Sequence, residues 1–303
     1  MSGATGFAPR ESFEFRLPRG RRWTVGPRPA IMGVINATPD SFSDGGSYRE
    51  PADAVRAGRK MLEDGADLLD IGGESTRPGS RRVPAPEQLQ RILPILRGLR
   101  AETEAPISVD TRDPAVGEMA LASGADIIND VGACRDPGWI PVLRNNDVPV
   151  VLMHMRGTPE DMQQQTAYPR GVVEDVRDFL DERMESLEAE GIARDRFVLD
   201  PGIGFAKEAQ HNLQILSGLP RLLELGRPLL IGASRKFFLG KLLGQGNDGP
   251  GRAPEGRDIG TVAANAFALH GGASILRVHN VPYTRDLVDV FEGFVSFGET
   301  GSS

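Results

Sequence analysis

Short apolar runs rich in β-branched residues recur along the chain and alternate with longer stretches that have helical character. Both faces of these runs are apolar, which is typical of strands buried inside a parallel sheet. Eight such runs occur: IMGVI (31–35), DLLDI (67–71), PISVD (106–110), DIIND (126–130), PVVLM (149–153), RFVLD (196–200), PLLIG (228–232) and SILRV (274–278). Helices are expected at 51–65, 86–103, 114–124, 138–146, 170–190, 209–225, 258–271 and 284–296.

This alternating order predicts an α/β fold, a single (β/α)₈ TIM barrel that occupies residues 31–298. A doubly wound open sheet is the alternative, but such sheets usually have fewer strands. Residues 1–30 are expected to form a short strand or hairpin that caps the floor of the barrel. The segment 244–257 is rich in Gly and Pro and predicts a surface loop.

Composition narrows the class of protein. The single cysteine, Cys134, excludes an internal disulfide and suggests a reducing compartment. No uncharged apolar run approaches the roughly 18 residues of a membrane span, and the first thirty residues carry charges where a signal peptide needs apolar residues. A net charge of −7 argues against a nucleic-acid surface. We therefore expect a cytoplasmic protein with neither membrane nor nucleic acid as a partner, which must bind any anion through a local cluster of cations.

Polar residues follow all eight expected strands. Because the active site of such a barrel is built at the carboxyl ends of its strands, these residues are expected to share one rim. They are Asn36, Glu74, Thr76, Arg77, Asp110, Asn129, Asp130, His154, Asp200, Ser234, Arg235, Lys236, Arg277 and His279. Any one of them alone is as well explained by a turn or a helix cap. Their convergence on one rim favours a binding site.

The rim residues divide into two chemistries. Asp110, Asn129 and Asp200 suit a flat heterocycle with several N–H donors, because an ionised carboxylate only accepts hydrogen bonds. The other set is potentially cationic and suits phosphate or carboxylate: Arg77, Arg235, Lys236, Arg277 and His279. The loops 36–46 and 72–80 are longer than ordinary βα turns, which favours loops that close over a ligand.

Eight motifs in order along the chain carry a family resemblance: MGVINATPDSFSDGG, DIGGESTRPGS, SVDT, INDV, VLMHMRGTP, DPGIGFAK, GASRK and LRVHN. Through them the sequence closely resembles the dihydropteroate synthase family, the folate-pathway enzymes that sulfonamides inhibit. The resemblance implies a TIM barrel, usually a homodimer, that joins 7,8-dihydropterin-6-ylmethyl diphosphate to 4-aminobenzoate. Pyrophosphate is released with the help of Mg²⁺.

The resemblance also implies a role for each matching residue. The pterin would be held by Asp110, Asn129, Asp200, Lys236 and Met153. The diphosphate would be held by Asn36, Thr76, Arg77, Arg277 and His279, with Asn36 as a ligand of Mg²⁺. The aminobenzoate would lie against Pro78 and Phe205, and its carboxylate would meet Ser234, Arg235 and the start of the helix near Lys236. The catalytic set would be Asp110, Lys236, Asp44, Thr76 and Arg77, with Asp44 as acceptor of the amine proton.

Two other functions are compatible with parts of the sequence. Methyltransferases that pass a methyl group from methyltetrahydrofolate to a corrinoid resemble this barrel and share its Asp and Asn floor. They need no diphosphate clamp, so GASRK, RVHN and STRPG favour the synthase. The second alternative is a paralogue that binds pterin without turnover. The presence of every matching motif residue argues against it.

Overall fold

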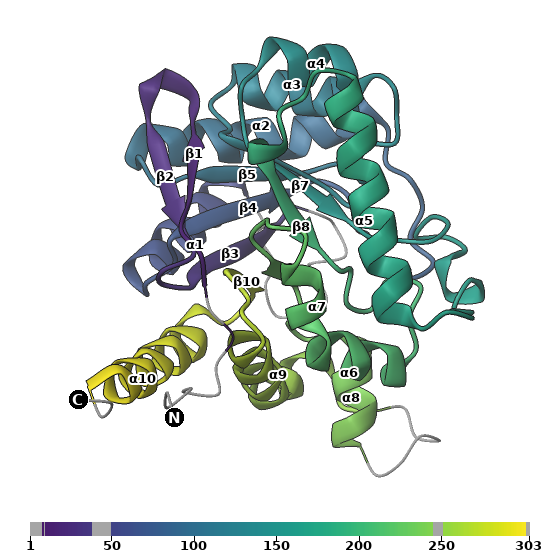
Figure 1. The fold of residues 1–303 in the computed structure, drawn as a ribbon. Coiled ribbons are helices and arrows are strands. Elements are labelled where there is room, and N and C mark those ends of the chain that lie inside the picture. Colours follow the sequence, from purple (N-terminus) through teal and green to yellow (C-terminus); the bar gives the residue numbers. More distant parts are fainter. Residues whose placement is uncertain (1–7, 9, 38–49, 245–250, 301–303) are drawn as a thin grey trace.

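Eight parallel strands form one sheet in the computed structural model, which describes residues 8, 10–37, 50–244 and 251–300. The order of the strands is β8-β7-β6-β5-β4-β3-β10-β9, and a bridge between Leu199 and Leu229 nearly closes the sheet into a barrel (Figure 1). The strands are β3 (Ala30–Asn36), β4 (Leu68–Gly72), β5 (Ile107–Asp110), β6 (Ile127–Asp130), β7 (Val150–Met153), β8 (Phe197–Asp200), β9 (Leu230–Ile231) and β10 (Ile275–Val278). Each lies in one of the eight predicted runs, apart from single end residues, which confirms the (β/α)₈ barrel.

The helices surround the sheet. They are α1 (Pro51–Glu63), α2 (Ala85–Glu102), α3 (Pro114–Ala122), α4 (Trp139–Asn145), α5 (Val172–Ala189), α6 (Ala209–Ser217), α7 (Leu219–Leu223), α8 (Phe237–Leu243), α9 (Asp258–His270) and α10 (Val281–Thr300). The single helix predicted for 209–225 is divided into α6 and α7 at Gly218, because Pro220 lacks the N–H that a continuous helix needs. The last helix begins at Val281 rather than 284, since Pro282 is tolerated in a first turn.

Local signals explain where the helices begin. The Asp113 side chain caps α3 by accepting a hydrogen bond from the Ala115 N–H at 3.1 Å, and Pro114 occupies the first helical position. Glu50 and Asp53 form a reciprocal capping box at the start of α1, where Pro51 again comes first. These signals start both helices at the rim, and each then runs back along the outside of the sheet.

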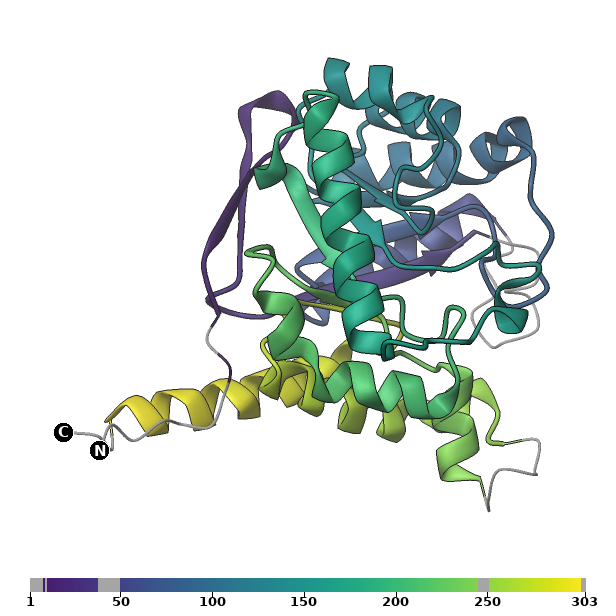
Figure 2. The same ribbon diagram turned by 45° about the vertical axis from the view of Figure 1, so that its right-hand side comes forward.

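An antiparallel hairpin of β1 (Phe13–Arg16) and β2 (Arg22–Val25) lies at the end of the barrel where the strands begin (Figure 2). Its buried residues Phe15, Leu17 and Val25 form one apolar cluster with residues at the starts of the barrel strands. The buried carboxylate of Asp126 accepts hydrogen bonds from Arg21 in the hairpin and from Arg100 in α2, the latter at 2.6 Å. The hairpin therefore covers the floor and leaves the opposite rim accessible.

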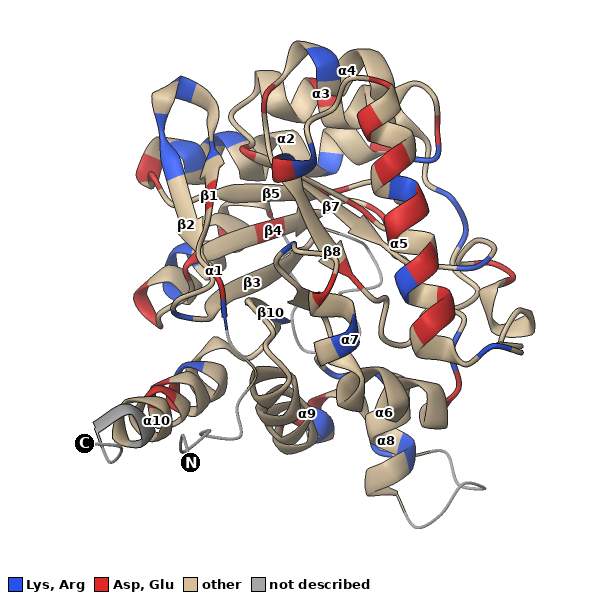
Figure 3. Ribbon diagram, viewed as in Figure 1, with Lys and Arg blue, Asp and Glu red and all other residues tan. Residues whose placement is uncertain are grey.

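Charged residues lie mainly on the outer helices. Acidic residues are dense along α5 (Figure 3), which matches the solvated face expected for an outer helix. Within the described ranges, no helix combines the length and apolar character needed to cross a bilayer.

Candidate active site

Side chains at the carboxyl ends of neighbouring strands meet inside the rim because the strands are in register. Gly72 on β4 is paired with Asp110 on β5, and Asp110 is paired with Asn129 on β6. Met153 on β7 is paired in the same way with Asp200 on β8. The predicted pterin-binding residues of four consecutive strands therefore lie at the same, carboxyl end of the barrel.

A buried charge network forms the floor of this site. The Arg277 guanidinium on β10 donates to Asp110 Oδ2 at 2.9 Å and to Asp70 Oδ2 at 2.7 Å. Asn129 Nδ2 donates to the same Asp70 oxygen at 3.2 Å. Arg277 thus joins two carboxylates that approach it from β4 and β5, and it offsets part of the cost of burying them.

Asp70 was not among the predicted site residues. It lies in the middle of β4, is completely buried, and its Oδ1 has no hydrogen-bond partner among the described residues. One signal could have found it, because an Asp inside the apolar run DLLDI has no place in a buried strand unless the barrel interior supplies a partner. That partner, Arg277, is 207 positions away in the sequence.

The network leaves Asp110 poised to gain or lose a proton near neutrality. Burial raises the pKa of Asp110 to about 7, the Arg277 guanidinium opposes this shift, and the negative charge of Asp70 adds to it. The neighbouring Asp130 on β6 serves a different purpose, since its two oxygens accept the backbone N–H groups of Gly132 and Cys134 at 2.6 and 2.8 Å. Asp130 therefore stabilises a turn, which is the structural role that the sequence also allowed for a polar residue at a strand end.

Lys236, Phe205 and Asp200 form the wall on the β8 and β9 side. Lys236 Nζ lies 4.0 Å from the centre of the Phe205 ring, a cation–π contact. Burial lowers the pKa of Lys236 to about 8, with Arg277 adding to the shift and Asp200 and Asp110 opposing it. Met153 belongs to the same apolar cluster as Phe205. The wall thus offers an apolar surface with one ammonium group at its edge.

His279 and Ser234 are hydrogen-bonded to each other. Ser234 Oγ lies 2.9 Å from His279 Nδ1, and the His279 backbone N–H donates to the same oxygen at 3.1 Å. Burial lowers the pKa of His279 to about 3, and the charges of Arg277, Arg235, Lys236 and Arg77 lower it further. His279 is therefore a neutral hydrogen-bonding group in the ligand-free site and not one of the five cations counted from the sequence.

Arg235 is held by α9. Its guanidinium donates to both oxygens of Asp258 at 2.7 and 3.0 Å, and its backbone N–H donates to Thr261 Oγ1 at 3.0 Å. The helix α8 does begin beside Lys236, as predicted, but the Arg235 groups that were expected to meet a carboxylate already have partners within the chain. A ligand carboxylate at this position has to share the Arg235 guanidinium with Asp258 or exchange with it.

Glu74 holds the loop that follows β4 in place through buried hydrogen bonds. The buried Glu74 carboxylate accepts the Val83 N–H at 2.8 Å and pairs with Arg112 at 3.0 Å. Within this loop Thr76 is half-buried, and Arg77 and Pro78 are exposed. The positive charge of Arg77 contributes to the lowered pKa values of Lys236 and His279, which places the loop's cation on the same side as these residues.

Asn36 ends β3 beside the network. A Cβ added at Gly72 would lie 3.6 Å from Asp110 Cβ and 3.9 Å from Asn36 Oδ1, so the glycine leaves room between these two residues. The amide oxygen is a ligand that Mg²⁺ accepts, and Mg²⁺ commonly takes only one or two protein ligands when phosphate oxygens complete its shell. Among the described residues there is no group of three or more His, Cys, Asp or Glu that could hold a metal ion. Asp44 and most of the first long loop lie outside the described residues.

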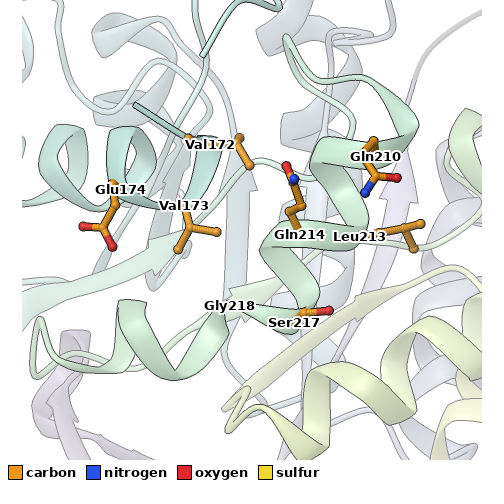
Figure 4. A pocket seen from close by; sticks show the side chains of 9 residues that line it. Val172, Val173, Glu174, Gln210, Leu213, Gln214, Ser217 and Gly218 are labelled. Carbon is orange, nitrogen blue, oxygen red and sulfur yellow. The ribbon is translucent and has the colours of Figure 1, made fainter. Parts of the chain in front are cut away.

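A separate groove lies between the start of α5 and α6 (Figure 4). Val173, Leu213 and Gln214 are among the residues that line it. None of the residues predicted from the sequence to bind substrate lines this groove, so the groove is separate from the site at the rim.

Comparison with known proteins gives a consistent result. A family model described as "Pterin binding enzyme" matches residues 32–279. The dihydropteroate synthase of Synechocystis sp. is 43% identical over 267 residues, covering 88% of this chain and 90% of the relative. A solved structure of Xanthomonas albilineans dihydropteroate synthase with 4-aminobenzoic acid is 46% identical with a TM-score of 0.84, covering 93% of this chain and 98% of the other.

Another structure of that enzyme, in complex with 7,8-dihydropteroate, is 41% identical with a TM-score of 0.78 and covers 94% of this chain and 98% of the other. The sequence motifs, the barrel and the charged rim agree with these matches. The chain belongs to the dihydropteroate synthase family of pterin-binding enzymes.

Proposed function

We propose that the chain is the transferase that condenses 7,8-dihydropterin-6-ylmethyl diphosphate with 4-aminobenzoate to give 7,8-dihydropteroate and pyrophosphate. The observation that carries the proposal is the buried network of Asp110, Arg277, Asp70 and Asn129 at the carboxyl ends of the strands. Such a network presents acceptors for a nitrogen-rich ring directly beside cations for a diphosphate. Its place in a member of this family identifies the ring as a pterin.

The pterin is held by complementary hydrogen bonds. Asp200 and Asp110 accept from the N–H groups of the ring, and Asn129 offers an amide group. Lys236 donates from the other side, and Met153 supplies the apolar contact for the ring face. Burial makes these hydrogen bonds strong and excludes water from the reacting carbon.

The reaction begins with loss of pyrophosphate. The electron-rich dihydropterin lets the C–O bond to the diphosphate break before the amine attacks, and the bonding electrons leave with pyrophosphate. The Asp110 carboxylate stabilises the positive charge left on the ring, and Arg77, Arg277 and the His279 N–H stabilise the departing anion, with Thr76 as a further hydrogen-bond donor. When bound, Mg²⁺ would be held by the Asn36 amide oxygen together with diphosphate oxygens and would supply further positive charge.

The second half of the reaction forms the C–N bond. The 4-aminobenzoate ring lies against Phe205 and Pro78, and its carboxylate is received near Ser234 and Arg235, where it shares these groups with their present partners His279 and Asp258 or exchanges with them. The amine lone pair attacks the cationic carbon, and Asp44 accepts the proton that the amine loses. The products are dihydropteroate and pyrophosphate.

An assay of the purified protein with dihydropterin diphosphate, 4-aminobenzoate and Mg²⁺ tests this function. We expect dihydropteroate and pyrophosphate in equal amounts. Binding of the dihydropterin with no release of pyrophosphate would instead support the pterin-binding paralogue. Methyl transfer from methyltetrahydrofolate to a free corrinoid, without any condensation, would support the methyltransferase.

The pKa values of the site predict a narrow pH optimum. Asp110 must be ionised to stabilise the cation, and Lys236 must be protonated to donate; burial brings their pKa values to about 7 and about 8. We expect kcat/KM for dihydropterin diphosphate to peak between these values, falling at lower pH as Asp110 gains a proton and at higher pH as Lys236 loses one. Lys236→Met should remove the alkaline limb, and because it also removes a cation that acts on Asp200 and Asp110, its acid limb should move to higher pH. A profile that is flat from about pH 6 to pH 9 would contradict these roles.

We also propose that the protein is a homodimer that pairs through its last helices. Large apolar side chains are exposed on α9 and α10, where Phe267 is 68% and Phe297 is 77% exposed, and Ile259, Val290 and Phe294 accompany them. A patch of this kind on a monomer marks an interface. Light scattering should give the mass of two chains, and Phe267→Glu with Phe294→Glu should give that of one. Met119→Glu, an exposed apolar position on α3, is the control that should leave the mass unchanged.

We further place the protein in the cytoplasm. Cys134 is free and buried, which suits a reducing compartment, and dihydropterin and aminobenzoate are small soluble substrates.

A further inference from the structure

Lys207 is a buried lysine just behind the rim, and the roles above make no use of it. It lies between β8 and α6, two residues after Phe205, and only 4% of it is exposed. Its Nζ donates to the Phe205 carbonyl oxygen at 3.0 Å and lies 2.8 Å from His154 Nδ1. Because lysines are almost never fully buried without partners, this position needs an explanation.

His154 is built to receive the Lys207 side chain. It follows β7, is buried, and packs edge-on against the Phe179 ring with 4.9 Å between ring centres. Burial lowers the pKa of His154 well below its ordinary value, and the charge of Lys207 lowers it further, so the neutral ring can accept a hydrogen bond at Nδ1. The His154 backbone N–H donates to the Asp200 carbonyl at 2.9 Å, which ties the end of β7 to the end of β8.

The hydrogen bond from Lys207 to Phe205 closes a tight loop that begins at Asp200. Asp200 Oδ1 accepts the Gly202 N–H at 2.7 Å, and the Phe205 N–H donates to the Gly202 carbonyl at 3.1 Å. Gly202 has a φ of +70°, and a Cβ there would lie 2.0 Å from the His154 carbonyl oxygen. A side chain at position 202 would therefore clash with the His154 backbone, so the loop packs closely against the end of β7. This close packing positions Asp200 and Phe205, the residues at its two ends.

Charge connects Lys207 to Asp200 as well. Burial lowers the pKa of Lys207 well below its ordinary value, Arg156 and Lys236 add to this shift, and the Asp200 carboxylate opposes it and so favours the protonated form. Around Asp200, burial raises the pKa of the carboxyl group, and the positive charges of Lys236, Arg277 and Lys207 hold it down. Lys236 and Arg277 belong to the proposed substrate site, whereas Lys207 acts on Asp200 from its place beside His154 and the Phe205 carbonyl.

We propose that Lys207 is a positioning residue for the synthase reaction: supported by His154, it holds the loop from Asp200 to Phe205 in place, and its protonated form adds a positive charge to the surroundings of the Asp200 carboxylate that binds the pterin. The inference rests on the proposed function, because it takes Asp200 and Phe205 as substrate-binding residues. It adds a role for the last residue of the DPGIGFAK motif.

The Lys207→Met variant separates this role from a purely structural one. Removing Lys207 alone leaves the buried His154 Nδ1 and the Phe205 carbonyl without their donor, so we expect Tm to fall, and activity is compared per folded molecule. We expect kcat/KM for dihydropterin diphosphate to fall about tenfold at neutral pH, and its acid limb to move to higher pH, because Asp200 loses a cation that favours its ionised form. The KM for 4-aminobenzoate should rise, because the Phe205 carbonyl loses its donor. Lys60→Met, at an exposed lysine of α1, is the matched control.

A second pair of variants tests the support. His154→Gln keeps an acceptor for Lys207, whereas His154→Leu removes it, so only the leucine variant should reproduce the Lys207→Met effect. The double variant Lys207→Met/His154→Leu should be no worse than Lys207→Met alone, since both changes break one interaction. Equal activity of the two His154 variants would contradict the proposal even if Lys207→Met did not fold.

Three further outcomes would also overturn it. These are unchanged kcat/KM in Lys207→Met, a loss of kcat/KM by the same factor at every pH, and unchanged binding of dihydropterin across the pH range. Binding is measured by calorimetry with the dihydropterin diphosphate alone, which needs no turnover. Absence of condensation in the wild-type chain would contradict the proposed function, and the calorimetric comparison would still decide the role of Lys207.

Discussion

Replacing Asp110 by asparagine is expected to lower kcat by about 10²–10³ while dihydropterin diphosphate still binds. The asparagine keeps the shape of the side chain and one acceptor oxygen beside Arg277, which now donates to Asp110 at 2.9 Å. It lacks the negative charge that stabilises the ring cation after pyrophosphate leaves. Because this charge matters more in the transition state than in the substrate complex, the loss should appear in kcat more than in binding.

The measurement is single-turnover release of pyrophosphate, with binding followed separately by calorimetry. Asp130→Asn is the matched control, because Asp130 is a second buried carboxylate at a strand end whose oxygens accept the backbone N–H groups of a turn and are assigned no contact with substrate. Its turnover per folded molecule should stay close to that of the wild type. Asp110→Asn with near wild-type turnover would remove Asp110 from the mechanism.

Replacing Arg277 by methionine is expected to reduce both stability and activity. The variant leaves the buried carboxylates of Asp70 and Asp110 without their shared cation, and removing one partner of a buried ion pair typically costs about 3–5 kcal/mol of the free energy of unfolding. The fall in kcat/KM should be large as well, because the diphosphate loses a cation and the pKa of Asp110 rises further.

The loss of stability should depend on pH in a defined direction. In the folded chain the pKa of Asp110 is already raised to about 7, so the folded state prefers the protonated form, and its stability falls as pH rises from the ordinary value of 3.8 through 7. Without Arg277 this preference grows. Urea unfolding should therefore show a larger difference between Arg277→Met and wild type at about pH 8 than at about pH 5.

A double variant checks the cause. Adding Asp70→Asn to Arg277→Met removes one of the two unpaired charges, so part of the lost stability should return. Arg277→Lys keeps the charge without the guanidinium fork that now spans Asp70 and Asp110, and an intermediate loss is expected. An Arg277→Met chain as stable as wild type at every pH would show that the network is not needed to bury these carboxylates.

Much of the architecture could be predicted because it rests on local patterns. Each apolar run corresponds to one strand, because a strand that is buried on both faces consists of consecutive apolar residues. The helix boundaries at Pro51 and Pro114 follow from caps a few residues long. The division at Gly218 was missed although Pro220 is a local signal for it, because the helical pattern of apolar residues continues across both positions.

The sequence predicted which residues belong to the site better than it predicted how they pair with each other. Asp110, Asn129, Asp200, Lys236 and Arg277 were recognised from their places in the last two positions of strands or shortly after them, and the barrel brings them to one rim. Asp70 was overlooked because it lies within a strand and its partner is far away in the sequence. The pairing of Arg235 with Asp258 was equally invisible, since the two residues belong to separate elements.

The sequence by itself determined the order of strands and helices, the family, and the kinds of chemical groups at the rim, because these depend on side-chain identity and short-range spacing. Only the tertiary structure decided which charges are paired and which are not. Barrel closure places Arg277 between Asp70 and Asp110 and surrounds His279 with cations, so one carboxyl group titrates near neutrality and one imidazole stays neutral. These properties arise from desolvation and from distances between residues far apart in the chain, which no local pattern records.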